Sequence, residues 1–323
     1  MILDNRNQNK NIGKVDLGVL YTILILLAIG VVMIYSASSF YSMFHYNDSM
    51  FYLKKQGIMA VIGLVAMFFM MNFDYHRLKK ITPKLLIITI PLLIAVFFFP
   101  AVNGAKRWIQ LGGLSFQPSE LTKYVVVLFL ALSIDIKGDG IKDFWTGIVP
   151  YLALSGFFAA LVLAEKNLSI AAIIMIVTFI LLFISGGKIK HLFGIVLPTL
   201  LTLAIFFIFS SDYRRARMLN FIDPWKDAAG DGYQLIQSFY ALGSGGITGL
   251  GLGQSRQKTL YMPEPHNDFI FSIIGEELGL IGCLLIISLF IIFIWRGVRI
   301  AIKAKDTYGK LLAMGITSII AVQ

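Results

Sequence analysis

Residues 15–36, VDLGVLYTILILLAIGVVMIYS, form an apolar run of 22 residues that decides the fold class. A helix needs about 20 apolar residues to cross the roughly 30 Å of hydrocarbon in a bilayer. Basic residues precede the run and small residues follow it, as in a secretory signal peptide. The apolar region of a signal peptide has only about 7 to 15 residues, so we expect a retained membrane-spanning helix.

Comparable apolar runs recur along the chain, at residues 58–72, 85–100, 121–134, 146–164, 168–185, 192–209 and 268–295, and a ninth begins at residue 311. The run at 121–134 is the weakest. Several runs are shorter than a full span, so their flanks must be helical or neighbouring helices must shield them. The sequence predicts an all-α polytopic membrane protein with eight transmembrane helices and part of a ninth, in a single membrane domain over residues 1–323.

The composition excludes several other classes of protein. The chain is 57% hydrophobic and 14% charged, whereas soluble domains are about 45–50% apolar and about 25% charged. A single cysteine and four histidines without metal-ligand spacing exclude a disulfide framework and a thiolate metal cluster. The net charge of +10 on a membrane protein indicates anionic lipids and phosphates as partners, and no nucleic acid.

The Lys and Arg residues predict the orientation of the chain. With the N-terminus in the cytoplasm, 16 of them fall on the cytoplasmic side and 11 on the outer side, as the positive-inside rule requires. The outer side then contains a large extracytoplasmic loop at residues 210–267. Because so long a connection is uncommon, this loop is a candidate functional element.

A group of polar residues follows the third apolar run on the outer side. Lys106 and Arg107 come first, and Pro118 then suits the first turn of a helix on which Glu120 and Lys123 share one face. One interpretation is an interfacial anchor with a self-neutralising Glu/Lys pair. The other is that these cations hold an anionic head group, because basic residues on the outer side oppose the orientation bias.

The long loop contains a glycine-rich stretch at residues 243–253, followed by Arg256 and Lys258. No Gly-Lys-Ser/Thr sequence closes the stretch and no strand precedes it, so we do not expect a nucleotide-binding loop. The glycines indicate flexible or close-packed backbone. Backbone amides beside Arg256 and Lys258 are also suited to holding phosphate oxygens.

The eighth apolar run opens with Pro263-Glu264-Pro265-His266-Asn267-Asp268. The two prolines disfavour a helix before this point, so Asp268 is expected near a helix N-terminus, where Asp is a favourable cap. The alternative is a general base that takes a proton from a sugar hydroxyl. Glu276 and Glu277 follow inside the apolar run and require partners there, such as cations on other helices.

These residues resemble the SEDS family of polytopic membrane proteins, the FtsW/RodA group. The matching stretches are residues 103–109, 117–123, 223–225, 232–238, the glycine-rich segment through Arg256, and 263–279. The long outer loop is more similar to the division and sporulation branch of the family than to its elongation branch.

The resemblance implies a peptidoglycan glycosyltransferase of the bacterial plasma membrane. Such an enzyme polymerises lipid II into nascent glycan and works with a class B penicillin-binding transpeptidase and other division or sporulation proteins. Asp268 falls on the family's essential aspartate and is the expected general base. The residues expected to contact substrate are Lys106, Arg107, Glu120, Lys123, Arg256, Lys258 and His266. No metal site is expected, although Mg²⁺ or Mn²⁺ is left open as a helper at the diphosphate.

Two departures from the family stand out. Where members commonly have Glu-Pro-Asp-Leu-Gly-Thr, this chain has Glu165-Lys166-Asn167-Leu168-Ser169-Ile170, which leaves the role of the segment open. The chain also stops at Gln323, inside the ninth run, and we expect a C-terminal truncation. Two other functions remain open, namely a lipid II flippase with a polar path through the helices and a non-catalytic scaffold for the transpeptidase.

Overall fold

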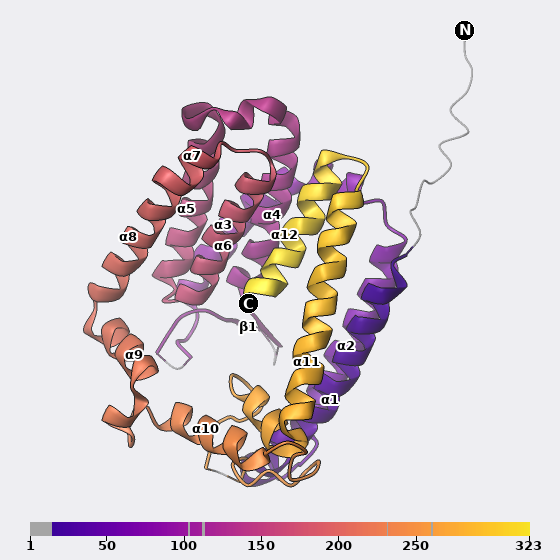
Figure 1. Ribbon diagram of the computed structural model, residues 1–323, viewed down its shortest axis with the longest axis vertical. Coiled ribbons are helices and arrows are strands. Elements are labelled where there is room, and N and C mark those ends of the chain that lie inside the picture. Colours follow the sequence, from indigo (N-terminus) through magenta and orange to yellow (C-terminus); the bar gives the residue numbers. More distant parts are fainter. Residues whose placement is uncertain (1–14, 103, 112–113, 231, 260) are drawn as a thin grey trace. The chain divides into compact units, whose positions relative to one another are not determined.

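The computed structural model describes residues 15–102, 104–111, 114–230, 232–259 and 261–323. The described chain is mostly α-helical (Figure 1). It forms two compact units, one of residues 1–73 with 202–293 and the other of residues 74–201 with 294–323. Three cations that support the predicted orientation lie outside the described residues, namely Arg6, Lys10 and Lys14.

The first unit begins with two helices that pack against each other, α1 (Leu17–Tyr46) and α2 (Phe51–Met71). The carboxylate of Asp16 accepts a hydrogen bond from the Val19 amide at 3.1 Å and so caps the start of α1. Asn47 ends α1 in the left-handed conformation, with its own amide bonded to the Met43 carbonyl. Both helices are longer than the apolar runs that predicted them.

The segment at 210–267, which we expected to be a large loop, contains ordered helices. They are α9 (Asp212–Ile222), η6 (Pro224–Asp227) and α10 (Tyr233–Gly245). The long helix α11 (Ile270–Lys303) follows, and its residues up to 293 belong to the first unit. A small apolar core joins α1, α10 and α11 through Met33, Ala37, Ala241, Met262, Ile273, Ile274 and Ile286.

The glycine-rich stretch lies against a kink in α11 at Gly279, whose φ of 67° is not helical. The amides of Leu250 and Gly251 donate to the carbonyls of Glu276 and Glu277 at 2.9 and 3.0 Å. A Cβ added to Gly249, at φ +81°, would lie 2.2 Å from the Glu277 carbonyl oxygen. Gly249 therefore requires close-packed backbone, whereas Gly243, Gly246 and Gly253 have open space around an added Cβ.

The second unit is a bundle of five longer helices. They are α3 (Leu78–Ala95), α4 (Pro118–Lys137), α5 (Val149–Ala164), α6 (Leu168–Ile184) and α12 (Thr307–Val322). Shorter elements connect them: η1 (Tyr75–Arg77), η2 (Val96–Phe98), η3 (Gly138–Lys142), η4 (Phe144–Ile148), α7 (Ile189–His191), η5 (Leu192–Val196) and the start of α8 (Leu197–Phe209).

Helix α4 lies at the centre of this bundle and contacts α3, α5, α6 and α12 (Figure 1). It begins at Pro118, as the sequence predicts. A short antiparallel hairpin, β1 (Ile109–Leu111) and β2 (Leu114–Phe116), leads into it with Ile109 opposite Phe116. The hairpin and an isolated antiparallel bridge between Val102 and Ala105 depart from the all-α prediction.

Six of the described helical segments are long and apolar enough to cross a membrane. They are Leu17–Tyr46, Phe51–Met71, Tyr75–Phe98, Phe144–Ala164, Ile189–Phe209 and Ile270–Lys303. Two shorter apolar helices, Leu168–Ile184 and Thr307–Val322, also coincide with predicted runs. The weakest run, 121–134, lies within α4, which contacts four other helices and is shielded by them.

Candidate functional site

Asp268 lies in the first unit, two residues before α11 begins at Ile270. Its side chain is exposed, and among the described residues nothing donates a hydrogen bond to its carboxylate or forms an ion pair with it. The capping interpretation therefore has no hydrogen bond to support it. The role of Asp268 as a general base stays a prediction.

His266, two residues earlier, is held by aromatic side chains. Its ring centroid lies 4.0 Å from that of Tyr52 on α2 and 5.6 Å from that of Tyr41 on α1. The residue is only 8% exposed, and its Nδ1 atom has no hydrogen-bond partner among the described residues. Burial lowers the pKa of the imidazole, because an apolar environment disfavours the charged form. His266 thus fixes the segment that leads to Asp268, and its contact with substrate stays a prediction.

Lys258 forms a buried ion pair with Glu277. The Lys258 Nζ to Glu277 Oε1 distance is 2.7 Å, and the two side chains are 7% and 0% exposed. The Ser36 hydroxyl on α1 also donates to this carboxylate, at 2.7 and 2.8 Å. Lys258 therefore neutralises a helix carboxylate, and binding of phosphate by this residue stays a prediction.

The hydrogen-bond donors to the Glu276 carboxylate come from residues 255–257, in the loop that also contains Lys258. Its carboxylate accepts the Ser255 hydroxyl, the Arg256 amide at 2.8 Å and the Gln257 amide at 3.4 Å. The adjacent glutamates thus have the partners that sequence analysis required, but a loop supplies most of them. Sequence reasoning missed the two serines, Ser36 and Ser255, because nothing in their local sequence distinguishes them from other small polar residues.

The Arg256 side chain remains exposed, and no ion pair involves it in the described part of the chain. It lines a groove of about 750 Å³ between the loop and α1, with Tyr35, Phe40 and Met43 on the helix side. Aromatic and aliphatic walls beside one free guanidinium suit a molecule with an apolar chain and an anionic group.

In the second unit, Lys106 and Arg107 interact with backbone carbonyls. Lys106 Nζ donates to the Phe97 carbonyl at 2.8 Å. Arg107 donates through Nε to the Glu165 carbonyl at 3.4 Å and through Nη2 to the Lys166 carbonyl. A guanidinium has five N–H donors, so Arg107 retains several for an anion.

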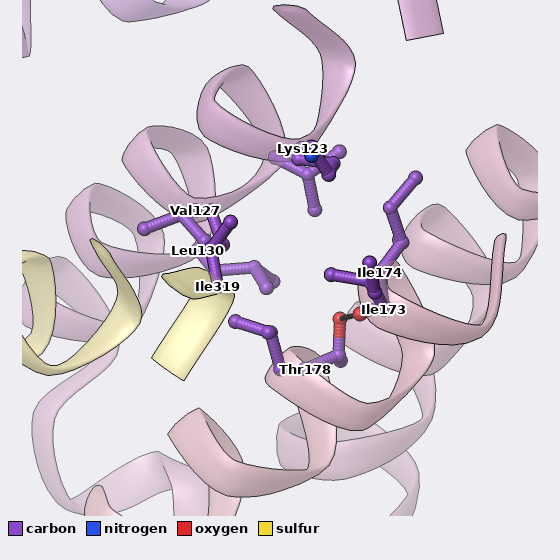
Figure 2. Close-up of a pocket in the computed structure, with 9 residues that line it drawn as sticks. Lys123, Val127, Leu130, Ile173, Ile174, Thr178 and Ile319 are labelled. Carbon is purple, nitrogen blue, oxygen red and sulfur yellow. Dashed lines mark hydrogen bonds between the residues drawn. The ribbon is translucent and has the colours of Figure 1, made fainter. Parts of the chain in front are cut away.

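Glu120 and Lys123 pair on α4 as predicted, with 2.8 Å between Oε2 and Nζ. Lys123 is buried and also donates to Gln323 Oε1 at 2.8 Å. Lys123 lines a small pocket in the bundle together with aliphatic side chains of α4, α6 and α12 (Figure 2), including Leu130, Ile174 and Ile319. The charge of Lys123 is therefore largely neutralised within the bundle.

Glu165 follows α5 and is the least satisfied carboxylate of the second unit. It is 1% exposed, and neither carboxylate oxygen has a hydrogen-bond partner among the described residues. Burial raises the pKa of this carboxyl from about 4.5 to about 7, and nearby Ser119 and Arg107 offset only part of that effect. Glu165 lies at a departure from a family motif, and the sequence alone predicted no role for it.

No group of three or more His, Cys, Asp or Glu side chains within the described ranges is arranged to hold a metal ion. A Mg²⁺ or Mn²⁺ ion that accompanies a diphosphate stays a prediction.

The sequence matches a known family and several named relatives. The model of the family described as "Cell cycle protein", which covers FtsW, RodA and SpoVE, matches residues 17–323. A probable peptidoglycan glycosyltransferase FtsW from Geobacter sp. (strain M18) is 40% identical over 312 residues, which cover 95% of this chain and 84% of that protein. Stage V sporulation protein E from Bacillus subtilis (strain 168) is 41% identical over 314 residues, 95% of this chain and 85% of that protein.

The fold also matches a solved structure. A chain from work described as "Structural coordination of polymerization and crosslinking by a peptidoglycan synthase complex" superposes with a TM-score of 0.75 and 26% sequence identity. The match covers 94% of this chain and 83% of the other. The observed helical architecture is therefore shared with a component of such a complex.

Proposed function

The chain belongs to the family of FtsW, RodA and SpoVE cell cycle proteins, and from this premise we propose that it polymerises lipid II with Asp268 as the general base. It is a multi-pass membrane protein of the bacterial plasma membrane and a peptidoglycan glycosyltransferase that serves cell division or sporulation. Lipid II as substrate, the roles of individual residues and the orientation of the chain in the membrane are the parts that we propose.

The observation that carries the assignment of Asp268 is its free carboxylate at the head of α11. The preceding buried His266 holds the segment in place, while Asp268 itself is exposed and unpaired among the described residues. A general base must reach the proton that it removes, and a carboxylate without competing donors can do so. Asp268 takes the proton from the 4-hydroxyl of the acceptor N-acetylglucosamine.

The deprotonated oxygen attacks C1 of the donor N-acetylmuramic acid. The bond from C1 to the diphosphate breaks, and undecaprenyl diphosphate leaves with the bonding electrons. Attack from the face opposite the leaving group converts the α-linked donor into a β-1,4-linked glycan. Negative charge grows on the diphosphate in the transition state, so cations at that position accelerate the reaction.

Three of the expected cations lack a carboxylate partner in an ion pair across the described residues: Lys106, Arg107 and Arg256. Lys123 and Lys258 are each paired with a glutamate at 2.8 and 2.7 Å. Within each unit, the unpaired cations are therefore better candidates for contact with a phosphate group than the paired lysines. The groove beside Arg256 has apolar walls that suit a polyprenyl chain.

We place the N-terminus in the cytoplasm, and we propose that the chain contains eight membrane spans and part of a ninth. The long apolar helices and the excess of cytoplasmic Lys and Arg support this topology. Asp268 and the loop before it then lie on the outer face, where lipid II presents its sugars. We further propose a class B penicillin-binding transpeptidase as partner, and the similarity to a chain studied in a peptidoglycan synthase complex supports it.

The test is polymerisation of lipid II by the chain in proteoliposomes, with and without the transpeptidase. Asp268→Asn should reduce glycan yield by at least about 100-fold, the lower end of the contribution of a general base. Asp48→Asn is the matched control, because Asp48 is also an acidic residue outside the helices of the first unit but pairs with Lys54. It should retain wild-type yield.

Wild-type polymer from Asp268→Asn would refute the role of the aspartate. Movement of lipid II across the bilayer without any polymer would identify a flippase. Neither activity, combined with unchanged binding of the transpeptidase, would identify a scaffold.

A further inference from the structure

Glu165 is a buried carboxyl that takes no part in the proposed reaction. It is the C-cap of α5, 1% exposed, and both of its oxygens lack hydrogen-bond partners among the described residues. An ionised carboxylate without donors is strongly disfavoured in such an environment. A structural glutamate would normally have partners, as Glu277 does. The isolation of Glu165 therefore requires an explanation.

Hydrogen bonds connect the turn that contains Glu165 to the segment that contains Arg107. Arg107 donates to the carbonyls of Glu165 and Lys166, and Lys166 Nζ donates back to the Gly104 carbonyl at 3.2 Å. Lys166 adopts the left-handed conformation, with φ +62°. These contacts hold the guanidinium next to the carboxyl while leaving the carboxyl oxygens themselves free.

The other charged groups around Glu165 are accounted for. On the Arg107 segment, Lys106 donates to the Phe97 carbonyl. On α4, Glu120 and Lys123 neutralise each other. The groups that act on the pKa of Glu165 are the Ser119 hydroxyl and the charge of Arg107, and burial outweighs both, so that this pKa is about 7.

A carboxyl with such a pKa changes its charge near neutral pH, and its charge affects what Arg107 can bind. When ionised, Glu165 places a negative charge beside the guanidinium and opposes a second anion there. When protonated, it leaves the positive charge of Arg107 available. Conversely, a bound anion favours the protonated carboxyl. Anion binding and proton binding are therefore linked.

We propose that Glu165 is a positioning residue of the phosphate site, which takes up a proton from solvent when the diphosphate of the substrate binds beside Arg107. This inference rests on the proposed function, because it assumes that lipid II binds through Arg107. Glu165 forms no bond to the substrate. It adjusts the charge of the site so that a doubly charged diphosphate is accepted and held.

The first measurement uses the wild-type protein alone. Lipid II binding is followed by titration calorimetry in detergent, in two buffers with different ionisation enthalpies, which gives the number of protons taken up. About half a proton should be taken up at pH 7, and none at pH 5, where Glu165 is already protonated. The diphosphate of lipid II is a diester, so its own charge is constant over this range.

The second measurement compares Glu165→Gln with the wild type between pH 6 and pH 8.5. Wild-type Kd for lipid II should rise about tenfold over this range, as expected when a nearby charge shifts a pKa by about one unit. Glu165→Gln, which mimics the protonated state, should keep a low and nearly constant Kd and take up no proton. Asp139→Asn removes an exposed carboxylate that pairs with Lys142 and should behave as the wild type.

A pH-independent wild-type Kd without proton uptake would overturn the inference and leave the proposed function intact. Equal pH dependence in the wild type and Glu165→Gln would also overturn it, since another group would then titrate. Absence of lipid II binding at every pH would instead overturn the proposed substrate, and the inference with it. If Glu165→Gln fails to fold, the wild-type proton count alone decides.

Discussion

Glu277 in the first unit and Glu165 in the second are both buried carboxylates, yet their surroundings are opposite. Glu277 receives the Lys258 ammonium at 2.7 Å, the Ser36 hydroxyl at 2.7 Å and the Ser255 amide at 3.3 Å. Glu165 receives no hydrogen bond on either oxygen from the described residues. The first arrangement favours one fixed ionised state, and the second favours a group that changes its charge.

The difference teaches that burial alone does not identify a functional carboxylate. Glu277 is as buried as Glu165, but its donors join α1, the loop at 253–259 and α11, so removal of any of them should disturb the fold. Neither oxygen of Glu165 has a hydrogen-bond donor to lose in the part of the chain that is described. Variants in the two regions should therefore change stability in opposite directions.

Lys258→Met should cause the largest loss of stability. It leaves the Glu277 carboxylate buried without its cation, and removal of one partner of a buried ion pair typically costs about 3–5 kcal/mol. The variant should yield little folded protein, or a much lower thermal midpoint in detergent measured by tryptophan fluorescence. The double variant Lys258→Met with Glu277→Leu should recover part of the loss, because no unpaired charge remains.

If Lys258→Met had the same thermal midpoint as the wild type, the Lys258–Glu277 ion pair would not stabilise the fold, and Glu277 would not differ from Glu165 in this respect. It would also mean that Lys258 is free to bind phosphate. Activity lost without a change in midpoint would favour the same conclusion.

Gly249→Ala should also destabilise the protein, because the added methyl group would clash with the backbone at Glu277. The added Cβ would lie 2.2 Å from the Glu277 carbonyl oxygen, at a φ of +81°. Left-handed backbone and overpacking together should cost about 3 kcal/mol. The matched control is Gly243→Ala within α10, where nothing lies within 4 Å of the new Cβ.

Gly243→Ala should be neutral or stabilise the protein by up to about 1 kcal/mol, because alanine favours a helix. Both variants are compared by their thermal midpoints in the same detergent. Equal midpoints would mean that the glycine-rich stretch moves away from α11 and does not support Glu277.

The sequence predicted the features that depend on neighbouring residues. The apolar runs fall within helices, Pro118 begins α4, and Glu120 pairs with Lys123 three residues away. These features follow from local periodicity and spacing, which a single sequence displays directly. The hairpin before α4 was not predicted, because its strands are only three residues each and flank glycines.

The chemistry of the two buried carboxylates depends on contacts between distant residues. Ser36 and Glu277 are 241 residues apart in sequence, and no local pattern connects them. The need of Glu277 for a cation was predicted, but the choice of Lys258 was not. The isolation of Glu165 is a property of everything packed around it, so the sequence suggested only that its segment was unusual.

Glu165→Gln should change stability with the opposite sign, and only where the pH is high enough to ionise the carboxyl. The pKa of Glu165 is raised from about 4.5 in the unfolded chain to about 7 in the fold, so the folded state binds the proton more tightly. The associated stability is fully present below pH 4.5 and is lost as pH rises to about 7. Glutamine remains neutral and avoids this loss. At pH 8 the variant should therefore be more stable than the wild type by up to about 3 kcal/mol.

The sign of this difference, and its dependence on pH, separate Glu165 from Glu277. Thermal midpoints of Glu165→Gln and the wild type should coincide near pH 4.5 and diverge as the pH rises, while Asp139→Asn follows the wild type throughout. A lower midpoint for Glu165→Gln at pH 8 would mean that the ionised carboxylate has partners in the folded protein, as Glu277 has. In that case the two regions would be alike, and Glu165 would be a structural residue that holds the α5–α6 turn.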